Sequence, residues 1–194
     1  MPKSEEENLI FKALMEIVTN GRWQEFEILE LSDCSGVQPS IIGEKYRDKT
    51  SILVAFAEYI DRQTLEALDE EIKSPAIPVR ERLLEVLLAR FDVLTPYKAG
   101  IVELLKQALK DPAMLITGSE SLKKSMCLSI EAVGLSSAGL SGMLKAKGLG
   151  AVFLAGLCAW SREESDNLDV TTRILDERLK LIENFMIRTG LADT

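Results

Sequence analysis

Histidine is absent from the 194-residue chain, and cysteine is scarce. Without histidine, the chain cannot form a histidine-dependent catalytic triad, a histidine-ligated zinc site or a histidine general base. Its three cysteines, Cys34, Cys127 and Cys158, are isolated in the sequence, odd in number and form no Cys-x-x-Cys pair. We therefore expect them to be reduced, buried thiols.

A long uninterrupted apolar run is also missing. The longest apolar stretch lies near Gly148–Trp160 and is too short to cross a bilayer comfortably, because a spanning helix needs about 20 apolar residues. The N-terminus begins Met1-Pro2-Lys3-Ser4 and lacks the basic start and apolar core of a signal peptide. We expect a cytoplasmic protein with no membrane span, in which the apolar stretch is a buried helix.

Basic residues are fewer than acidic ones: the chain has 23 lysines and arginines and 31 aspartates and glutamates, for a net charge of −8. Such an acidic chain does not look like a non-specific nucleic-acid binder. Only 6 prolines and 12 glycines interrupt the chain, which permits long helices. Alternation typical of strands is not evident, and a hydrophobic content of 46% is enough for a packed core. These features predict an all-α fold.

The helical signals are clearest at the N-terminus. Ser4 and Glu7 form a capping box, apolar residues then recur at helical spacing, and Asn20-Gly21 supplies a left-handed stop. By similar signals we expect helices at residues 4–20, 26–34, 38–45, 49–72, 79–94, 96–110, 120–133, 140–162 and 167–188. Pro75 and Pro78 bracket a short linker, which is the best candidate for a domain boundary.

Residues 26–45 have the form of a helix-turn-helix. A short apolar-faced helix is followed by Ser35-Gly36-Val37, where glycine suits a tight turn because it adopts positive φ freely. A second short helix then starts with Pro39 at a tolerated first-turn position. In a helix-turn-helix, the second helix presents its N-terminal residues to the major groove of DNA.

The residues of this segment also resemble a known family. Leu31-Ser32, Ser35-Gly36-Val37, Tyr46, Lys49 and Ile52-Leu53 occupy, without a gap, the places of characteristic residues in the head of tetracycline-repressor (TetR) family regulators. The resemblance covers about Leu9 to Asp61. It implies an all-α, TetR-like fold with a three-helix DNA-binding head at residues 1–50 and a helical body at residues 51–194, which binds a ligand and dimerises.

The resemblance also implies which head residues contact double-stranded operator DNA. Bases would be read by Gln38, Ser40 and Ile41, and the phosphate backbone would be held by Lys45, Tyr46, Arg47 and Lys49. This division is physically sensible, because backbone contacts fix the register and short polar groups read base edges.

Two departures from the family pattern bear on DNA binding. Gly43 stands where the family usually has an aromatic residue, and Glu44 adds an acidic group next to it. Residues 1–60 carry six basic and eleven acidic side chains, a net charge of −5. Because phosphate attraction dominates affinity for DNA, an alternative is that the head has kept its fold and lost DNA binding.

The last two predicted helices have the pattern of a dimer interface. Leu168, Leu175 and Ile182 recur every seven residues, and Thr172, Leu179 and Met186 form a second stripe offset by four. A stripe of small residues in the preceding helix permits close helix approach. The residues we expect at the interface of a homodimer are Ala151, Ala155, Leu168, Leu175, Leu179 and Ile182. The alternative is that the same stripes pack within one chain.

Inward-facing side chains of the body predict an apolar ligand pocket. The predicted lining comprises Phe91, Met126, Ile130, Phe153, Leu157 and Trp160. Methionine is adaptable and suits a pocket for variable apolar ligands. The alternative is an ordinary packed core.

The most favoured function is therefore a TetR-type transcriptional regulator that responds to a small apolar ligand. The segment from Trp160 to Arg178 resembles the C-terminal helices of certain TetR-type regulators, and also the lipid-binding ubiquinone-biosynthesis family, which shares the fold but does not repress transcription. That family has a Trp-Tyr pair near the place of Gly142-Met143 in this chain. The alternative function is thus binding of a lipid or isoprenoid without DNA binding.

Motifs for catalysis and cofactors are weak. Gly148-Leu149-Gly150 lacks the third glycine of a dinucleotide loop and follows no strand. The Ser-x-x-Lys match at Ser121 lacks its companion motifs. A metal site would need more converging ligands than the acidic pairs supply. We expect no enzyme activity, no cofactor and no metal.

Overall fold

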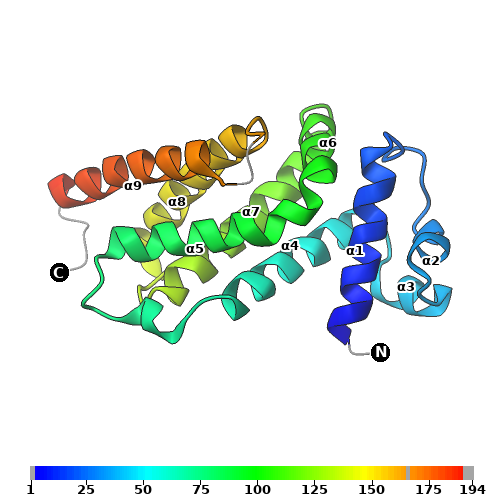
Figure 1. The fold of residues 1–194 in the computed structure, drawn as a ribbon, viewed down its shortest axis with the longest axis horizontal. Coiled ribbons are helices and arrows are strands. Elements are labelled where there is room, and N and C mark those ends of the chain that lie inside the picture. Colours follow the sequence, from blue (N-terminus) through cyan, green and yellow to red (C-terminus); the bar gives the residue numbers. More distant parts are fainter. Residues whose placement is uncertain (1–2, 165–166, 190–194) are drawn as a thin grey trace. The chain divides into compact units, whose positions relative to one another are not determined.

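The computed structural model describes residues 3–164 and 167–189, and every regular element in those residues is helical (Figure 1). The prediction of an all-α fold is confirmed. The helices are α1 (Lys3–Thr19), α2 (Glu30–Ser35), α3 (Pro39–Lys45), α4 (Lys49–Glu66), α5 (Val79–Leu94), α6 (Lys98–Ala108), α7 (Pro112–Ala132), α8 (Gly139–Trp160) and α9 (Asp169–Thr189), with 3-10 turns η1 (Glu70–Lys73) and η2 (Thr95–Tyr97).

Local signals explain the ends of the short helices near the N-terminus. Gly36 follows α2 with a φ of 71°, in the left-handed region that glycine adopts without strain. Pro39 lies in the first turn of α3, where its missing amide proton is not needed. Asp48 and Ser51 cap α4 reciprocally. The Ser51 amide donates to Asp48 Oδ1 at 2.6 Å, and the Asp48 amide donates to Ser51 Oγ at 3.1 Å.

Three helix boundaries differ by four residues or more from the sequence predictions. Helix α2 begins at Glu30 and not near residue 26. Helix α7 begins at Pro112 and not near residue 120, because Asp111 acts as an N-terminal cap. Its Oδ1 accepts the amide of Ala113 at 2.9 Å. Helix α4 ends at Glu66, and the predicted extension to residue 72 is replaced by the 3-10 turn η1.

The chain forms two compact units, and the first contains the helix-turn-helix. It comprises the residues up to Ile60 together with Leu94–Ser121. Helix α1 packs against α2 and α6, and its Phe11 ring lies 5.4 Å from Phe56 and 5.0 Å from Tyr59, between ring centroids. Tyr97 also packs against Phe56 at 5.2 Å. Burial, followed by its contact with Tyr59, raises the pKa of the Tyr97 phenol.

This first unit is larger than the head of residues 1–50 that the sequence predicted. Tyr97 donates a hydrogen bond to Asn8 Oδ1 at 3.0 Å, and Gly100 packs directly on Met15. A β-carbon at Gly100 would lie 2.7 Å from the Met15 sulfur. Because α6 therefore packs on α1 without a gap for a side chain, residues distant in the sequence join the compact unit of the head.

The second unit comprises Asp61–Val93 and the chain from Leu122 onward. Helices α8 and α9 pack against each other within it (Figure 1). Gly156 of α8 permits this approach, since a β-carbon there would lie 2.6 Å from Leu175 Cδ2 of α9 and 3.2 Å from the Phe91 ring. Phe91 stacks on Phe153 with centroids 5.2 Å apart. These contacts form a packed core in which α9 is held by α8 of its own chain.

A buried polar network ties α4 to the core of the second unit. Asp61 forms an ion pair with Arg90 of α5, and both side chains are 8% exposed. Ser125 of α7 donates to Asp61 Oδ2 at 3.0 Å and accepts from Arg90 Nη2 at 3.1 Å. The Arg90 guanidinium also lies 5.4 Å from the Phe153 ring centroid. The pair is thus stabilised by further hydrogen bonds, as a buried ion pair requires.

Helix α8 is long and apolar enough to cross a membrane by length and composition alone, with a mean hydropathy of 1.4 over its most apolar window. Of that window, 44% is buried inside the protein, so α8 is in part a core helix and in part an exposed one. The predicted burial of the cysteines is wrong for Cys34 and Cys158, which are free and exposed. They lie on outward faces of α2 and α8, and Cys127 is half-buried.

Candidate nucleic-acid interface and ligand cavity

The turn between α2 and α3 is fixed by side-chain hydrogen bonds. Ser32 Oγ donates to the Val37 carbonyl at 2.6 Å, and the Val37 amide donates to Ser35 Oγ at 3.2 Å. Leu31 of α2 and Ile42 of α3 are both fully buried. The two short helices are therefore joined as the sequence predicted, with a tight turn at Gly36.

The start of α3 faces outward. Gln38 and Ser40 are exposed and Ile41 is half-buried, whereas Ile42 points into the core. Gly43 is exposed with open space around it, and Glu44 beside it is exposed. The predicted base-reading residues are thus on an accessible helix face.

The predicted phosphate contacts differ among themselves in accessibility, and Lys45 is exposed but paired. Lys45 Nζ lies 3.7 Å from Glu6 Oε2 of α1. Tyr46 is buried, with its ring 6.3 Å from that of Phe11. Arg47 is exposed. Of these three residues, Arg47 has the side chain best placed to reach a phosphate.

Lys49 is half-buried and bound by groups of its own chain. Its ammonium group donates to the carbonyl oxygens of Trp23 and Gln24, each at 2.8 Å. It also lies 4.8 Å from the centroid of the buried Phe26 ring. Sequence reasoning did not find this contact, because the two carbonyls belong to a loop 25 and 26 residues earlier. In this structure Lys49 holds that loop to the start of α4.

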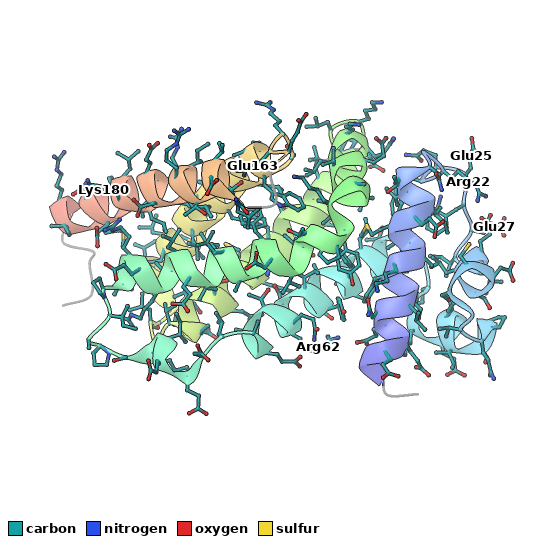
Figure 2. The ribbon with its side chains drawn as sticks, in the orientation of Figure 1. Arg22, Glu25, Glu27, Arg62, Glu163 and Lys180 are labelled. Carbon is teal, nitrogen blue, oxygen red and sulfur yellow. The ribbon has the colours of Figure 1, made fainter. Side chains whose placement is uncertain are left out.

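The loop ahead of α2 adds acidic charge near the helix-turn-helix. Glu25 and Glu27 lie on the segment that joins α1 to α2, together with Arg22 (Figure 2). Arg22 pairs with Glu30 at 2.8 Å, while Glu25 and Glu27 are exposed. A DNA-binding surface here would carry carboxylates at its edge, which lowers affinity at low salt.

The predicted ligand pocket residues form packed core in the second unit. Phe91, Met126, Ile130, Phe153, Leu157 and Trp160 are all buried. The rings of Phe91 and Trp160 are in contact at 5.7 Å between centroids. Among these six residues, only Ile130 also lines a described cavity.

That cavity lies between α5, the end of α7, the first half of α8 and the second half of α9. Its volume is about 280 Å³. The wall is largely apolar and includes Leu83, Ile130, Leu149, Leu179, Ile182 and Met186. Arg80, Lys145 and Glu183 supply charge to the lining. Sequence reasoning missed it, since the empty space depends on how four helices meet.

The predicted dimer residues divide into two groups. Leu168, Leu175 and Leu179 are buried within the chain, so these side chains have little surface for a second copy. Ile182 is half-buried, lines the cavity and would lie 3.2 Å from a β-carbon on Gly148. Ala151 is exposed and Ala155 half-buried on α8. The heptad stripe of α9 thus packs largely against α8 of the same chain.

A second apolar stripe lies on the outward faces of α8 and α9. The exposed apolar residues of these faces are Leu140, Met143, Ala151, Leu154, Val170, Leu181 and Phe185. In α9, Leu181 is 59% exposed and Phe185 58% exposed. Patches of exposed apolar side chains mark interaction surfaces. The exposed residues of α9 lie off the predicted stripe, whereas Ala151 of α8 belongs to the prediction.

The Glu163 side chain, just after α8, caps the N-terminus of α9. Its carboxylate accepts the amide of Val170 at 2.7 Å, the amide of Thr171 at 3.1 Å and the Thr171 hydroxyl at 2.5 Å. Figure 2 shows Glu163 at the junction of the two helices. A carboxylate here also complements the positive end of the α9 dipole. Among the described residues, no cluster of three or more acidic or cysteine side chains has the arrangement of a metal site.

Solved structures share this architecture. No protein-family model and no curated protein sequence matches the chain. A TetR transcriptional regulator from Nitrosomonas europaea is similar with a TM-score of 0.69 and 17% sequence identity, over 90% of this chain and 96% of that one. A TetR-family regulator from a Rhodococcus species is similar with a TM-score of 0.52 and 19% identity, over 94% of this chain and 99% of that one. The predicted TetR-like fold is confirmed.

Proposed function

We propose that this protein is a TetR-type DNA-binding transcriptional regulator of the cytoplasm, and not an enzyme. The observation that carries the proposal is the outward face at the start of α3, where Gln38 and Ser40 are exposed while Ile42 fixes the helix to the core. Short polar side chains at this end of a recognition helix can reach base edges in the major groove. The partner is a double-stranded DNA operator.

The regulator acts as a homodimer in this proposal. Two copies would join through the outward faces of α8 and α9, where Leu154, Leu181 and Phe185 are exposed. A twofold interface uses the same patch on both copies, and a dimer presents two recognition helices to two half-sites. Ala151 and Ala155 remain part of this surface, whereas Leu168, Leu175 and Leu179 support it from inside.

A small apolar ligand controls DNA binding in this proposal. Helix α4 carries Lys49 in the first unit and Asp61 in the second. Since Asp61 is tied to Arg90 and Ser125, a ligand that rearranges the second unit acts directly on the end of α4. Such coupling requires that the ligand bind two states of the protein with different affinity.

The test is an anisotropy titration with duplex DNA from the region upstream of the protein's own coding sequence. A shuffled duplex of the same composition is the competitor, at about 50 and about 200 mM salt. We expect preference for the natural duplex, and Gln38→Ala should reduce that preference by about 1–3 kcal/mol. The matched control is Gln24→Ala, on an exposed loop residue. Equal affinity for both duplexes at every salt concentration contradicts the proposal.

A second candidate function is lipid or isoprenoid binding without DNA binding. It is favoured by the charge of the head, in which Lys45 pairs with Glu6 and Lys49 is held by two carbonyls. Native mass spectrometry of the purified protein separates the candidates. A retained lipid together with no DNA preference supports the lipid carrier, and a protein without lipid that binds its upstream DNA supports the regulator.

A further inference from the structure

A second cavity of the same unit is lined by the C-terminal ends of α4 and α7 and by the 3-10 turn η1. Its volume is about 670 Å³, within the range of about 300–1,000 Å³ for small-molecule pockets. The exposed side chains of Leu65 and Leu128 line it together with the buried Ile72. This hollow, the α4–α7 cavity, therefore offers apolar surface to a guest molecule.

The charged side chains of the α4–α7 cavity are mostly acidic. Asp69, Glu70 and Glu131 line it with carboxylates, and Lys73 supplies one ammonium group. In the part of the chain that the structure describes, the side chains of Asp69, Glu70 and Lys73 have no ion-pair or hydrogen-bond partner. Glu131 accepts from Ser137 Oγ at 2.5 Å, and a hydroxyl donor does not cancel its charge. Three carboxylates against one ammonium group leave an excess of negative charge for a guest.

The helix ends beside the cavity add negative potential. Leu65 lies in the last turn of α4 and Glu131 in the last turn of α7, and neither turn contains a basic residue. The C-terminal end of a helix carries a partial negative charge, which a cation stabilises. Arg82 donates to the Val133 carbonyl just beyond α7, but it does not line the cavity. Even when Arg82 is counted, the carboxylates outnumber the cations, so the electrostatics favour a positively charged guest.

We propose that the α4–α7 cavity binds an amphiphilic organic cation of the alkylammonium class, with its chain against Leu65 and Leu128 and its ammonium group at the carboxylates. Burial of the chain contributes affinity because apolar area leaves water. The ammonium group gains charge-assisted hydrogen bonds to carboxylate oxygens. A metal ion fits the cavity less well, because no three acidic or cysteine side chains of the described residues have the arrangement of a metal site.

Occupancy of the α4–α7 cavity bears on the ligand response proposed above. Leu65 belongs to α4 and Leu128 to α7, so a bound cation joins the ends of two helices of this unit, and α4 also carries Asp61. This consequence for regulation rests on the proposed function, whereas binding of the cation does not. Because the test contains no DNA, failure to bind the cation and failure to bind an operator are separate results.

The probes are octylammonium chloride, the uncharged 1-octanol and sodium octanoate, each titrated into the full-length protein labelled at isoleucine and leucine methyl groups. We expect octylammonium to shift the resonances of Leu65, Ile72 and Leu128 and to bind more tightly than 1-octanol, with octanoate the weakest of the three. Ile182, which lines the cavity beside α9, should stay in place. An absence of shifts with octylammonium, or an affinity no higher than that of 1-octanol, overturns the proposal. Shifts confined to Ile182 and its neighbours place the cation in the cavity beside α9 and also overturn it.

One pair of variants tests recognition of the ammonium group. Asp69→Asn combined with Glu70→Gln keeps the shape of both side chains and removes two negative charges. It should weaken octylammonium by about three- to tenfold, the size of two exposed ion pairs, and leave 1-octanol unchanged. The matched control is Glu81→Gln combined with Glu85→Gln, which removes the same charge from exposed positions of α5 outside the cavity. An equal loss of octylammonium binding in that control would attribute the effect to net charge and contradict the assignment.

A second pair of variants tests the apolar wall. Leu128→Asn removes apolar surface from the cavity and should weaken octylammonium and 1-octanol alike, by about threefold or more. Because Leu128 is exposed, the substitution should not unfold the protein. Leu109→Asn changes an exposed leucine of the other unit and should leave both probes unaffected. Unchanged binding of both probes to the Leu128→Asn protein contradicts the assignment.

Discussion

The Lys49 ammonium nitrogen lies 2.8 Å from the Trp23 carbonyl oxygen and joins the loop ahead of α2 to the first turn of α4. The same nitrogen reaches the Gln24 carbonyl at 2.8 Å and lies over the Phe26 ring. One side chain thus satisfies two carbonyls that follow α1 and places a cation against a buried aromatic ring. The contact makes Lys49 a structural element of the head.

Lys49→Met should therefore destabilise the protein. The loss of two hydrogen bonds from a charged donor and of a cation–π contact is expected to lower the free energy of unfolding by about 1–3 kcal/mol. Urea unfolding followed by circular dichroism measures the change. Lys123→Met, on an exposed lysine of α7, is the control and should change stability by less than about 0.5 kcal/mol. Equal stability of the two variants would show that the Lys49 contacts contribute nothing.

Arg47 should behave differently from Lys49, because its side chain is exposed beside the end of α3. If it contacts a phosphate, Arg47→Gln weakens binding uniformly across sequences and reduces the slope of log K against log salt by about one. Anisotropy titrations at several salt concentrations measure that slope. An unchanged slope in Arg47→Gln would remove this arginine from the interface.

The helix-turn-helix could be predicted from sequence because its signals are local. Gly36, Pro39 and the Asp48–Ser51 cap each specify a turn or a helix end from neighbouring residues alone. The partners of Lys49 could not be predicted in this way, since they depend on how a loop more than twenty residues away folds back. The sequence predicts that Lys49 lies at the start of α4, but its contacts are known only from the folded structure.

The packing of α9 likewise could not be predicted from local signals, because it depends on which of its faces contacts α8. Its sequence is apolar on two faces, one with Leu175 and Leu179 and another with Leu181 and Phe185. The heptad prediction used the stripe of Leu175 and that of Leu179, and did not include Leu181 or Phe185. Helical spacing alone does not say which face of α9 is covered by α8 of the same chain. The glycines of α8 decide this, because Gly148 and Gly156 receive Ile182 and Leu175 at close distance.

The pair between Lys45 and Glu6 predicts a variant that binds DNA more tightly, in contrast to Arg47→Gln. Glu6→Gln removes an acidic group 3.7 Å from Lys45 Nζ and leaves the lysine available to DNA. We expect the affinity for DNA to rise by about two- to five-fold at low salt and the gain to shrink at high salt, where charges are screened. Glu16→Gln removes the same charge from an exposed position of α1. An equal gain in that control would attribute the effect to net charge and not to the pair.

The buried network around Asp61 should be sensitive to removal of one partner. Asp61→Asn leaves the Arg90 cation buried without its carboxylate, and the expected loss of unfolding free energy is about 3–5 kcal/mol. The double variant Asp61→Leu with Arg90→Met removes both charges and should be less destabilised than Asp61→Asn, because replacement of a buried pair by apolar groups is often neutral. Urea unfolding compares the two proteins. A double variant as unstable as the single one would show that Arg90 contributes through its other contacts.

Substitutions on the outward face of α9 test the proposed homodimer. Leu181→Glu combined with Phe185→Glu places two carboxylates on an apolar stripe that would be buried twice in a symmetric interface, so association should be lost at micromolar concentration. Sedimentation velocity measures the mass of each species. The matched control is Leu109→Glu combined with Leu115→Glu, which changes two exposed leucines of the other unit and should leave the dimer intact. Leu181 and Phe185 are more than half exposed in the single chain, so the double substitution should not unfold the protein. A dimer that survives in this variant would place the interface elsewhere.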